Sequence, residues 1–160
     1  MQTDYSSVTD ALLDAEHIYI IGNGAAASIA DHFACDLLKN CRLPAISLCS
    51  NSAMITAIAN DSSFDYVFST QLRMLFGSRD LLVVFSGSGN SENLVQAVKI
   101  ISRNLVISGN HGGKLKGYAS VFYGLETSDQ MESENKMSEF CHDVVTRLRQ
   151  QNKRINVISE

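Results

Sequence analysis

The sequence predicts an α/β fold: a three-layer sandwich in which helices cover both faces of a five-stranded parallel sheet. Short apolar segments alternate with segments of helical character along most of the chain. The apolar segments lack regular polar and apolar alternation, which is typical of strands buried on both faces. A chain of 160 residues also suits one domain with a single core of ordinary size. We therefore expect residues 1–160 to form one domain.

Five apolar segments are predicted to form the strands. They lie at residues 17–22, 44–49, 80–86, 104–109 and 120–125. Alternation of strands with helices implies right-handed crossovers between parallel strands. Five strands favour a flavodoxin-like order, and ligands of such sheets bind beyond the carboxyl ends of the strands, near the point where the strand order reverses. The loops after the first and third strands are therefore the candidate binding loops.

Five longer segments are predicted to form helices, because their apolar residues recur with helical rather than strand-like spacing. They lie at residues 25–39, 51–59, 66–75, 91–102 and about 130–150. Residues 1–16 are expected to form a short N-terminal helical segment, and residues from about 151 to 160 a polar C-terminal tail.

The composition is that of a globular protein, with 45% hydrophobic and 19% charged residues. The net charge of −4 and the lack of a long basic run argue against nucleic acid as the main partner. No apolar run approaches the ~18–20 residues that a bilayer-spanning helix needs, and the first ten residues, MQTDYSSVTD, do not resemble a signal peptide. We expect a cytoplasmic protein with no membrane partner.

The four cysteines form no Cys-x-x-Cys pair, so the sequence indicates neither a zinc ribbon nor a redox motif. They are Cys35, Cys41, Cys49 and Cys141. In a reducing cytoplasm they are expected to be buried small hydrophobic residues.

The loop after the first strand, IGNGAAAS, ends at Ser28 and fits the pattern G-x-G-x-x-A of dinucleotide-binding proteins. Such a site also needs an acidic residue near the end of the second strand to bind the ribose hydroxyls. That strand is followed by SLCSNSAM, which contains no acid, so a dehydrogenase is disfavoured. A tight strand-to-helix turn that needs glycine for its backbone conformation is the alternative interpretation.

The loop after the third strand, SGSGNS at residues 86–91, is unusually rich in small polar residues. The following helix has free N–H groups and a partial positive charge at its start. Gly87 and Gly89 allow successive N–H groups to converge on one anion, and Ser86, Ser88 and Ser91 add hydroxyl donors. The alternative is a flexible turn with one serine as helix cap, which leaves the other serines unexplained. The loop therefore favours phosphate binding without a Walker A motif.

Four segments resemble the sugar isomerase (SIS) domain family, and specifically its phosphoheptose isomerase type. The segments are GNGAAASIADHFACDLLKN, AIANDSSFDYVFSTQL, VVFSGSGNSEN and SGNHGGKL. They keep the family's order and approximate spacing from residue 18 to about 145, so the resemblance covers most of the chain. It implies a parallel sheet flanked by helices, aldose–ketose isomerisation, and a homotetramer, or a dimer, with active sites at subunit interfaces.

The resemblance also implies which residues bind the substrate. The family's phosphate pocket corresponds to Ser86, Gly87, Ser88 and Ser91 in this sequence. Its sugar contacts correspond to Asn23, Gly24 and Ala25 in the first loop. They also include Asn60 and Asp61, which follow the helix predicted at residues 51–59. Ala26 stands where the family often has a serine, and Ser28 is the next hydroxyl of that turn.

A second constellation joins an early and a late helix. His32 and Asp36 are four residues apart and share a helix face, and Glu134 and His142 are eight residues apart, about two turns. Two imidazoles and two carboxylates suit a Zn²⁺ ion. In phosphoheptose isomerases the corresponding patterns are His-x-x-x-Glu and Gln-x7-His. His32 and His142 match them, whereas Asp36 stands in place of the glutamate and Glu134 in place of the glutamine.

The resemblance to phosphoheptose isomerases implies an isomerase that converts sedoheptulose 7-phosphate to D-glycero-D-manno-heptose 7-phosphate for surface polysaccharide. A base removes the proton next to the carbonyl, an enediol(ate) forms, and a proton returns to the neighbouring carbon. Asp36 and His142 are the candidate proton-transfer residues, and zinc would polarise the carbonyl. The alternative function is a non-catalytic SIS module that binds a phosphosugar or a protein partner as a regulator.

Overall fold

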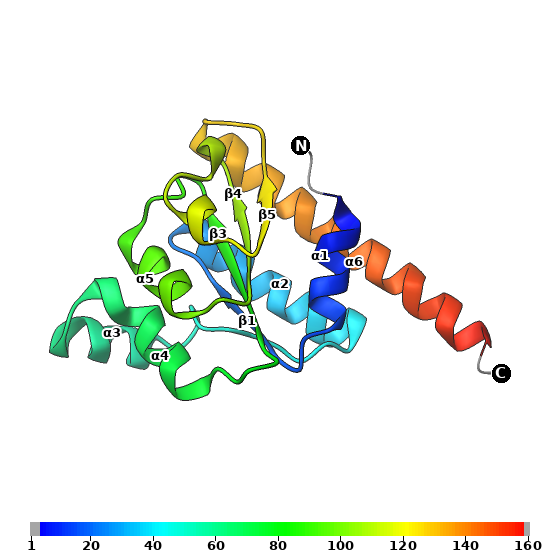
Figure 1. Cartoon of the computed structure of the whole chain (residues 1–160), viewed down its shortest axis with the longest axis horizontal. Helices are drawn as coiled ribbons and strands as arrows, with labels where there is room; N and C mark the ends of the chain where they lie inside the picture. Colours follow the sequence, from blue (N-terminus) through cyan, green and yellow to red (C-terminus); the bar gives the residue numbers. More distant parts are fainter. Residues whose placement is uncertain (1–3, 159–160) are drawn as a thin grey trace.

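The computed structural model describes residues 4–158 of the chain, and the side chains as far as Gln151. It contains one five-stranded sheet, made of β1 (Ile18–Ile21), β2 (Ala45–Ser47), β3 (Leu81–Ser86), β4 (Asn104–Ser108) and β5 (Val121–Gly124). All strands are parallel and their order is β2-β1-β3-β4-β5. The predicted α/β fold and flavodoxin-like order are therefore confirmed (Figure 1).

The helices lie close to their predicted positions. They are α1 (Tyr5–Leu13), α2 (Ala25–Cys41), α3 (Ser52–Asp61), α4 (Val67–Leu75), α5 (Glu92–Ile100) and α6 (Gln130–Ile158). Three short 3-10 turns, which the sequence does not predict, lie at Phe64–Tyr66, Asn110–Gly112 and Leu115–Tyr118. Helix α6 continues through residues 151–158, where a polar tail is predicted. The last two residues of that predicted tail lie outside the described part of the chain.

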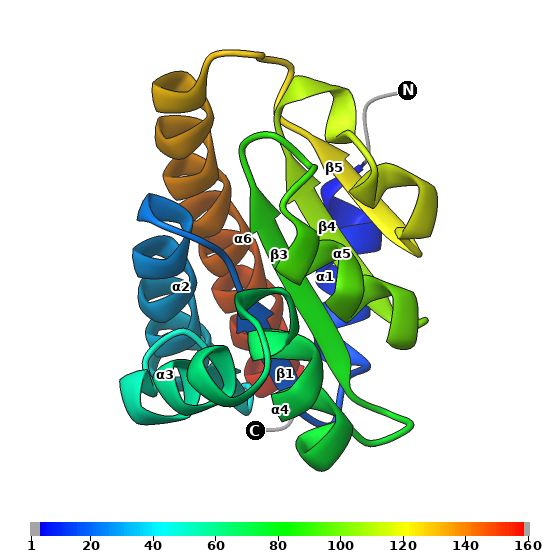
Figure 2. The ribbon, with the colours of Figure 1, turned by 90° about the vertical axis from the view of Figure 1, so that its left-hand side faces the viewer.

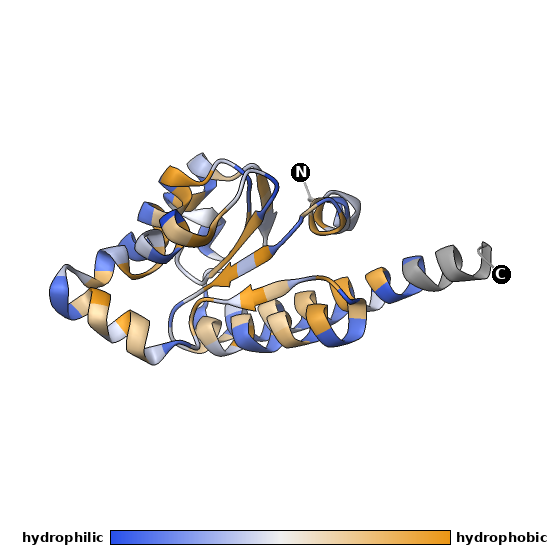
Figure 3. Cartoon of the chain, turned by 90° about the horizontal axis from the view of Figure 1, so that it is seen from below, coloured by the Kyte–Doolittle hydropathy of each residue, from blue (hydrophilic) through white to orange (hydrophobic). Residues whose placement is uncertain are grey.

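The strands divide their side chains between two hydrophobic cores, because successive residues of a strand point to opposite faces of the sheet. From β3, Leu81, Val83 and Phe85 join the core beneath α1, α2 and α6. Leu82 and Val84 join the core beneath α4 and α5. Figure 2 shows α2 and α6 on one side of the sheet and α4 and α5 on the other, and Figure 3 shows hydrophobic residues concentrated in the strands between these layers.

Because all five strands are parallel, their carboxyl ends lie at the same edge of the sheet. The order reverses between β1 and β3, since the chain passes to β2 on one side and to β4 on the other. The loops that follow β1 and β3 are therefore neighbours at the carboxyl edge. In the part of the chain that the structure describes, no helix has both the length and the hydrophobicity to cross a membrane.

At the opposite edge, a buried carboxylate fixes the entry to β3. Asp80 is 3% exposed. Its Oδ1 accepts hydrogen bonds from the backbone N–H of His17 and lies 3.1 Å from His17 Nδ1, while its Oδ2 accepts from the Gly77 N–H at 2.7 Å. Asp80 therefore joins the starts of β1 and β3, which are central neighbours in the sheet.

We expect Asp80→Ala to lower the free energy of unfolding by about 1–3 kcal/mol, because it removes the charged acceptor of the His17 and Gly77 N–H groups. Urea unfolding of the variant measures this loss. Asp14→Ala is the matched control: Asp14 is largely exposed and pairs with Arg103 at 2.7 Å, so its removal should cost less than about 1 kcal/mol. Equal losses in the two variants would show that the Asp80 contacts do not stabilise the sheet.

Candidate active site

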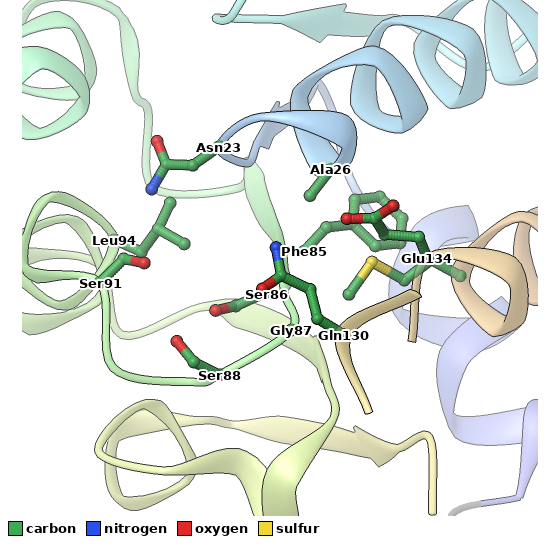
Figure 4. Close-up of a pocket in the computed structure, with 11 residues that line it drawn as sticks. Asn23, Ala26, Phe85, Ser86, Gly87, Ser88, Ser91, Leu94, Gln130 and Glu134 are labelled. Carbon is green, nitrogen blue, oxygen red and sulfur yellow. The ribbon is translucent and has the colours of Figure 1, made fainter. Parts of the chain in front are cut away.

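The loops after β1 and β3 and the start of α6 enclose a cavity of about 250 Å³ at the carboxyl edge of the sheet (Figure 4). Its lining combines hydroxyl, amide and carboxylate groups with an apolar floor. The lining residues are Asn23, Ala26, Phe85, Ser86, Gly87, Ser88, Ser91, Leu94, Gln130, Glu134 and Met137. All four residues of the predicted phosphate pocket are therefore part of one cavity.

The loop at residues 86–91 is held in shape by its own serines. The buried Ser86 hydroxyl accepts a hydrogen bond from the Gly89 N–H at 2.9 Å. The Ser88 Oγ accepts from the Asn90 N–H at 3.2 Å. Ser86 thus has a structural contact in addition to its place on the cavity wall, whereas Ser88 presents an exposed hydroxyl there.

A second glycine-rich loop supports the first. Gly89 has φ +69°, and a Cβ at this position would lie 2.1 Å from the carbonyl oxygen of Gly112. Asn90 joins the two loops, since its Nδ2 donates to the Ser88 carbonyl and its Oδ1 accepts from the Lys114 N–H. Glycine at position 89 is therefore required by both conformation and space, and the loop is packed in place before any ligand binds.

Ser91 occupies the N-cap position of α5 but makes no side-chain capping hydrogen bond. Its hydroxyl instead lies on the cavity wall (Figure 4). The N-terminus of α2 likewise begins at Gly24 without a side-chain cap, and Ala26 in its first turn lines the same cavity. Two helix ends that lack capping side chains therefore face one cavity, and each brings partial positive charge to it.

The first loop is joined to α5 by a pair of amides. Asn23 Nδ2 donates to Asn93 Oδ1 at 2.8 Å, and Asn93 Nδ2 donates to Asn23 Oδ1 at 2.9 Å. Asn93 is 2% exposed and its Oδ1 also accepts from the Leu94 N–H. Asn23 therefore holds the two loops together while it lines the cavity, a pairing that no local sequence pattern reveals.

Five of the predicted substrate contacts do not line the cavity. Gly24, Ala25 and Ser28 lie exposed at the start of α2. Asn60 and Asp61 are exposed at the end of α3, where Asn60 Nδ2 donates to Asp61 Oδ1 at 3.0 Å. Gly24, Ala25 and Ser28 are thus close in sequence to the lining residues Asn23 and Ala26, whereas no residue of α3 lines the cavity.

Helix α6 forms the wall opposite the loops after β1 and β3. Gln130, Glu134 and Met137 follow the i, i+4, i+7 spacing of one helix face and all line the cavity. Gln130 and Met137 are not predicted from the sequence, although this spacing could have indicated them once Glu134 was chosen. A Cβ on Gly87 would lie 3.8 Å from Gln130 Cγ, so the start of α6 packs directly against the serine loop.

Further along α2 and α6, the structure brings together His32, Asp36 and His142. The Nε2 atoms of the two histidines are 3.4 Å apart, and His32 Nε2 is 3.3 Å from Asp36 Oδ2. One potential ligand atom from each of the three residues lies within 4.8 Å of the others. Residues 110 positions apart in the sequence thus form one cluster, which the predicted constellation requires.

The cluster is a group of side chains that could hold a metal ion. In a tetrahedral site with Zn–N bonds of about 2.0–2.1 Å, two ligand nitrogens lie about 3.3–3.4 Å apart. The distances from His32 Nε2 to His142 Nε2 and to Asp36 Oδ2, 3.4 and 3.3 Å, match this spacing. Asp36 Oδ1 also accepts from Asn40 Nδ2 at 2.9 Å, an outer contact that orients the carboxylate. Glu134, the fourth predicted ligand, lines the cavity and is not in the cluster.

The four cysteines differ in their exposure to solvent. Cys41 and Cys141 are buried and Cys49 is partly buried, but Cys35 is exposed, so the prediction of burial is wrong for Cys35. Its position on α2, between the buried residues Ala34 and Leu37, turns it toward solvent. Burial, reinforced by the negative charge of Asp36, raises the pKa of the Cys141 thiol. Cys141 therefore stays protonated and is a poor metal ligand.

The fold and cavity define a class of protein: an α/β protein with a serine-rich loop that lines a cavity at the point of strand reversal. A family model described as the SIS domain matches residues 3–103. The chain belongs to the SIS domain family, which confirms the resemblance drawn from its motifs.

Within this family, the chain is similar to proteins named phosphoheptose isomerase. The chain is 36% identical over 146 residues to a protein of Campylobacter concisus named phosphoheptose isomerase, with 86% of this chain and 77% of that protein aligned. It is 38% identical over 121 residues to a probable phosphoheptose isomerase of Thermoplasma acidophilum, with 70% of this chain and 66% of that protein aligned. The chain thus spans about two thirds to three quarters of these relatives.

A solved structure of phosphoheptose isomerase from Neisseria gonorrhoeae superposes with a TM-score of 0.84 and 29% sequence identity. The superposition covers 90% of this chain and 84% of that one. The similarity therefore extends beyond residues 3–103, the segment matched by the SIS domain model.

Proposed function

We propose that the protein is a phosphoheptose isomerase, which converts sedoheptulose 7-phosphate to D-glycero-D-manno-heptose 7-phosphate through an enediol(ate). One observation carries the proposal: a cavity with a serine loop at one end lies on the same two helices as the His32–Asp36–His142 cluster. A sugar phosphate has an anion at one end and a carbonyl at the other, so it matches both features. The names of the relatives support the same activity.

The serine loop would bind the phosphate. Ser88 and Ser91 offer hydroxyl donors, and the uncapped start of α5 offers N–H groups and partial positive charge. Charge-assisted hydrogen bonds of this kind are about twice as strong as neutral ones. The apolar side chains of Phe85, Leu94 and Met137 then exclude water along the sugar.

The cluster would hold Zn²⁺ through His32, Asp36 and His142. When bound, the ion polarises the substrate carbonyl and stabilises negative charge on the enediolate oxygens. A nitrogen that holds a metal cannot hold a proton at the same atom. For that reason we propose that His142 and Asp36, the two predicted proton-transfer residues, would act by holding the metal ion close to the substrate oxygens.

The proposal extends to assembly and location. Several large apolar side chains are exposed on this chain, among them Leu38, Ile46, Phe64, Met74 and Leu75. Assembly into a homotetramer or a dimer would allow such side chains to be buried between copies. A cytoplasmic enzyme of this type would supply heptose for lipopolysaccharide or capsule.

The direct test is turnover. Purified protein loaded with zinc should convert sedoheptulose 7-phosphate to the aldose. NMR of the anomeric protons measures this conversion. The metal content of the same sample should be close to one zinc per chain. Phosphosugar binding without turnover and without bound zinc would favour the non-catalytic module instead.

A further inference from the structure

We infer that Glu134 is the catalytic base that moves the proton between the two reacting carbons. The inference rests on the proposed isomerase function and deepens it. Two carboxylates, Asp36 and Glu134, belong to the site, and their surroundings differ in a way that separates their roles. A base must reach the substrate with a free oxygen atom.

Both oxygens of Asp36 already have partners. Oδ1 accepts from Asn40 Nδ2 at 2.9 Å, and Oδ2 lies 3.3 Å from His32 Nε2. Asp36 also does not line the cavity. Its carboxylate would have to leave both contacts to reach a substrate carbon, so the geometry favours a role in holding the cluster.

Glu134 has the opposite surroundings. Its carboxylate makes no hydrogen bond or ion pair with any residue that the structure describes, and it lies on the cavity wall. Figure 4 shows it across the cavity from Asn23 and Ser91. Phe85 and Met137 line the cavity beside it. A partly buried carboxylate whose oxygens have no partner among the described residues can accept a proton from a substrate carbon in the cavity.

The position of Glu134 along α6 fits the substrate. It follows Gln130, which packs against the serine loop, by four residues, or about 6 Å of helix. It precedes His142 by eight residues, or about 12 Å, and helical side chains such as His142 lean back toward the N-terminus. A bound sugar whose phosphate lies in the serine loop would therefore extend along α6 past Glu134 toward the His32–Asp36–His142 cluster.

The proton transfer balances without any further reactant. Glu134 takes a proton from C1 of the ketose, the C1–H electron pair forms the C1–C2 double bond, and the carbonyl electron pair moves onto O2. The proton lost from O1 is transferred to O2, so that O2 becomes a hydroxyl and O1 carries the negative charge. The C1 carbonyl then forms as C2 takes the proton back from Glu134. The substrate is isomerised and Glu134 returns to its starting state.

Glu134→Gln tests the inference, because the amide keeps the shape of the side chain but cannot take a proton. We expect kcat to fall by on the order of a hundredfold to ten-thousandfold, with KM within about threefold of wild type. Incorporation of solvent deuterium into the sugar should fall by the same factor as kcat. Zinc content should not change. Glu134→Asp should recover part of the activity, and Glu139→Gln, an exposed carboxylate on the same helix, should behave as wild type.

Each outcome decides the matter. An inactive wild type would overturn the proposed isomerase function itself. With an active wild type, a Glu134→Gln variant that keeps its turnover and deuterium exchange would overturn the role of Glu134 as base. Loss of zinc in the same variant would identify Glu134 as a metal ligand and also overturn that role. If Glu134→Gln does not fold, Glu134→Asp takes its place: the displaced carboxylate should give turnover below that of the wild type with zinc retained, and wild-type turnover or loss of zinc would overturn the role.

Discussion

His142→Ala is expected to lose bound zinc and to lower turnover of sedoheptulose 7-phosphate by at least about a hundredfold. The variant removes one of three groups whose ligand atoms lie within 4.8 Å of one another, and two ligands rarely retain a zinc ion. Added zinc should restore a chelated wild-type enzyme but not the variant. Metal analysis after dialysis and a turnover assay measure both effects.

Thr146→Ala is the matched control for His142→Ala. Thr146 lies one turn further along the same ridge of α6 and is exposed, so its truncation should leave zinc content and turnover unchanged. Retention of zinc and activity by His142→Ala would remove the cluster from the mechanism.

Ser91→Asp is expected to weaken substrate binding strongly while the protein remains folded. Aspartate is a good N-cap residue, and Ser91 makes no capping hydrogen bond of its own, so the change should stabilise α5 by up to about 1 kcal/mol. The new negative charge would face the phosphate in the cavity. KM should rise by about a hundredfold or more, and inhibition by inorganic phosphate should disappear, because like charges at contact cost several kcal/mol.

Asn51→Asp provides the matched control for this charge. Asn51 caps α3 with a side-chain hydrogen bond to the Met54 N–H and does not line the cavity. The variant therefore adds the same charge at another helix start, and KM should remain at the wild-type value. Unchanged phosphate inhibition in Ser91→Asp would exclude the serine loop as the phosphate site.

Local patterns predicted most of the fold because the determining interactions are close in sequence. The run LLVVFS at residues 81–86 is hydrophobic on both faces, so its burial between two helical layers follows from composition. The serine loop could be predicted for the same reason: the end of a strand, the glycines and the helix start are all consecutive in the chain.

Contacts between distant segments were harder to predict. The pairing of Asn23 with Asn93 depends on where two loops meet, and neither residue belongs to a pattern that implies the other. The proximity of His32 and His142 could be predicted only through the resemblance to the family, because helical spacing predicts neighbours only within one helix. The separation of Glu134 from that cluster required the three-dimensional arrangement of α2 and α6.

The most direct test of the central claim is a crystal structure of the wild-type protein with zinc and sedoheptulose 7-phosphate. We predict that the phosphate lies within hydrogen-bonding distance of the Ser88 and Ser91 hydroxyls. We also predict zinc between His32, Asp36 and His142, and the carbonyl end of the sugar near Glu134. A phosphate bound away from the serine loop, with the sugar outside the cavity, would contradict the claim that this loop and this cluster form one isomerase site.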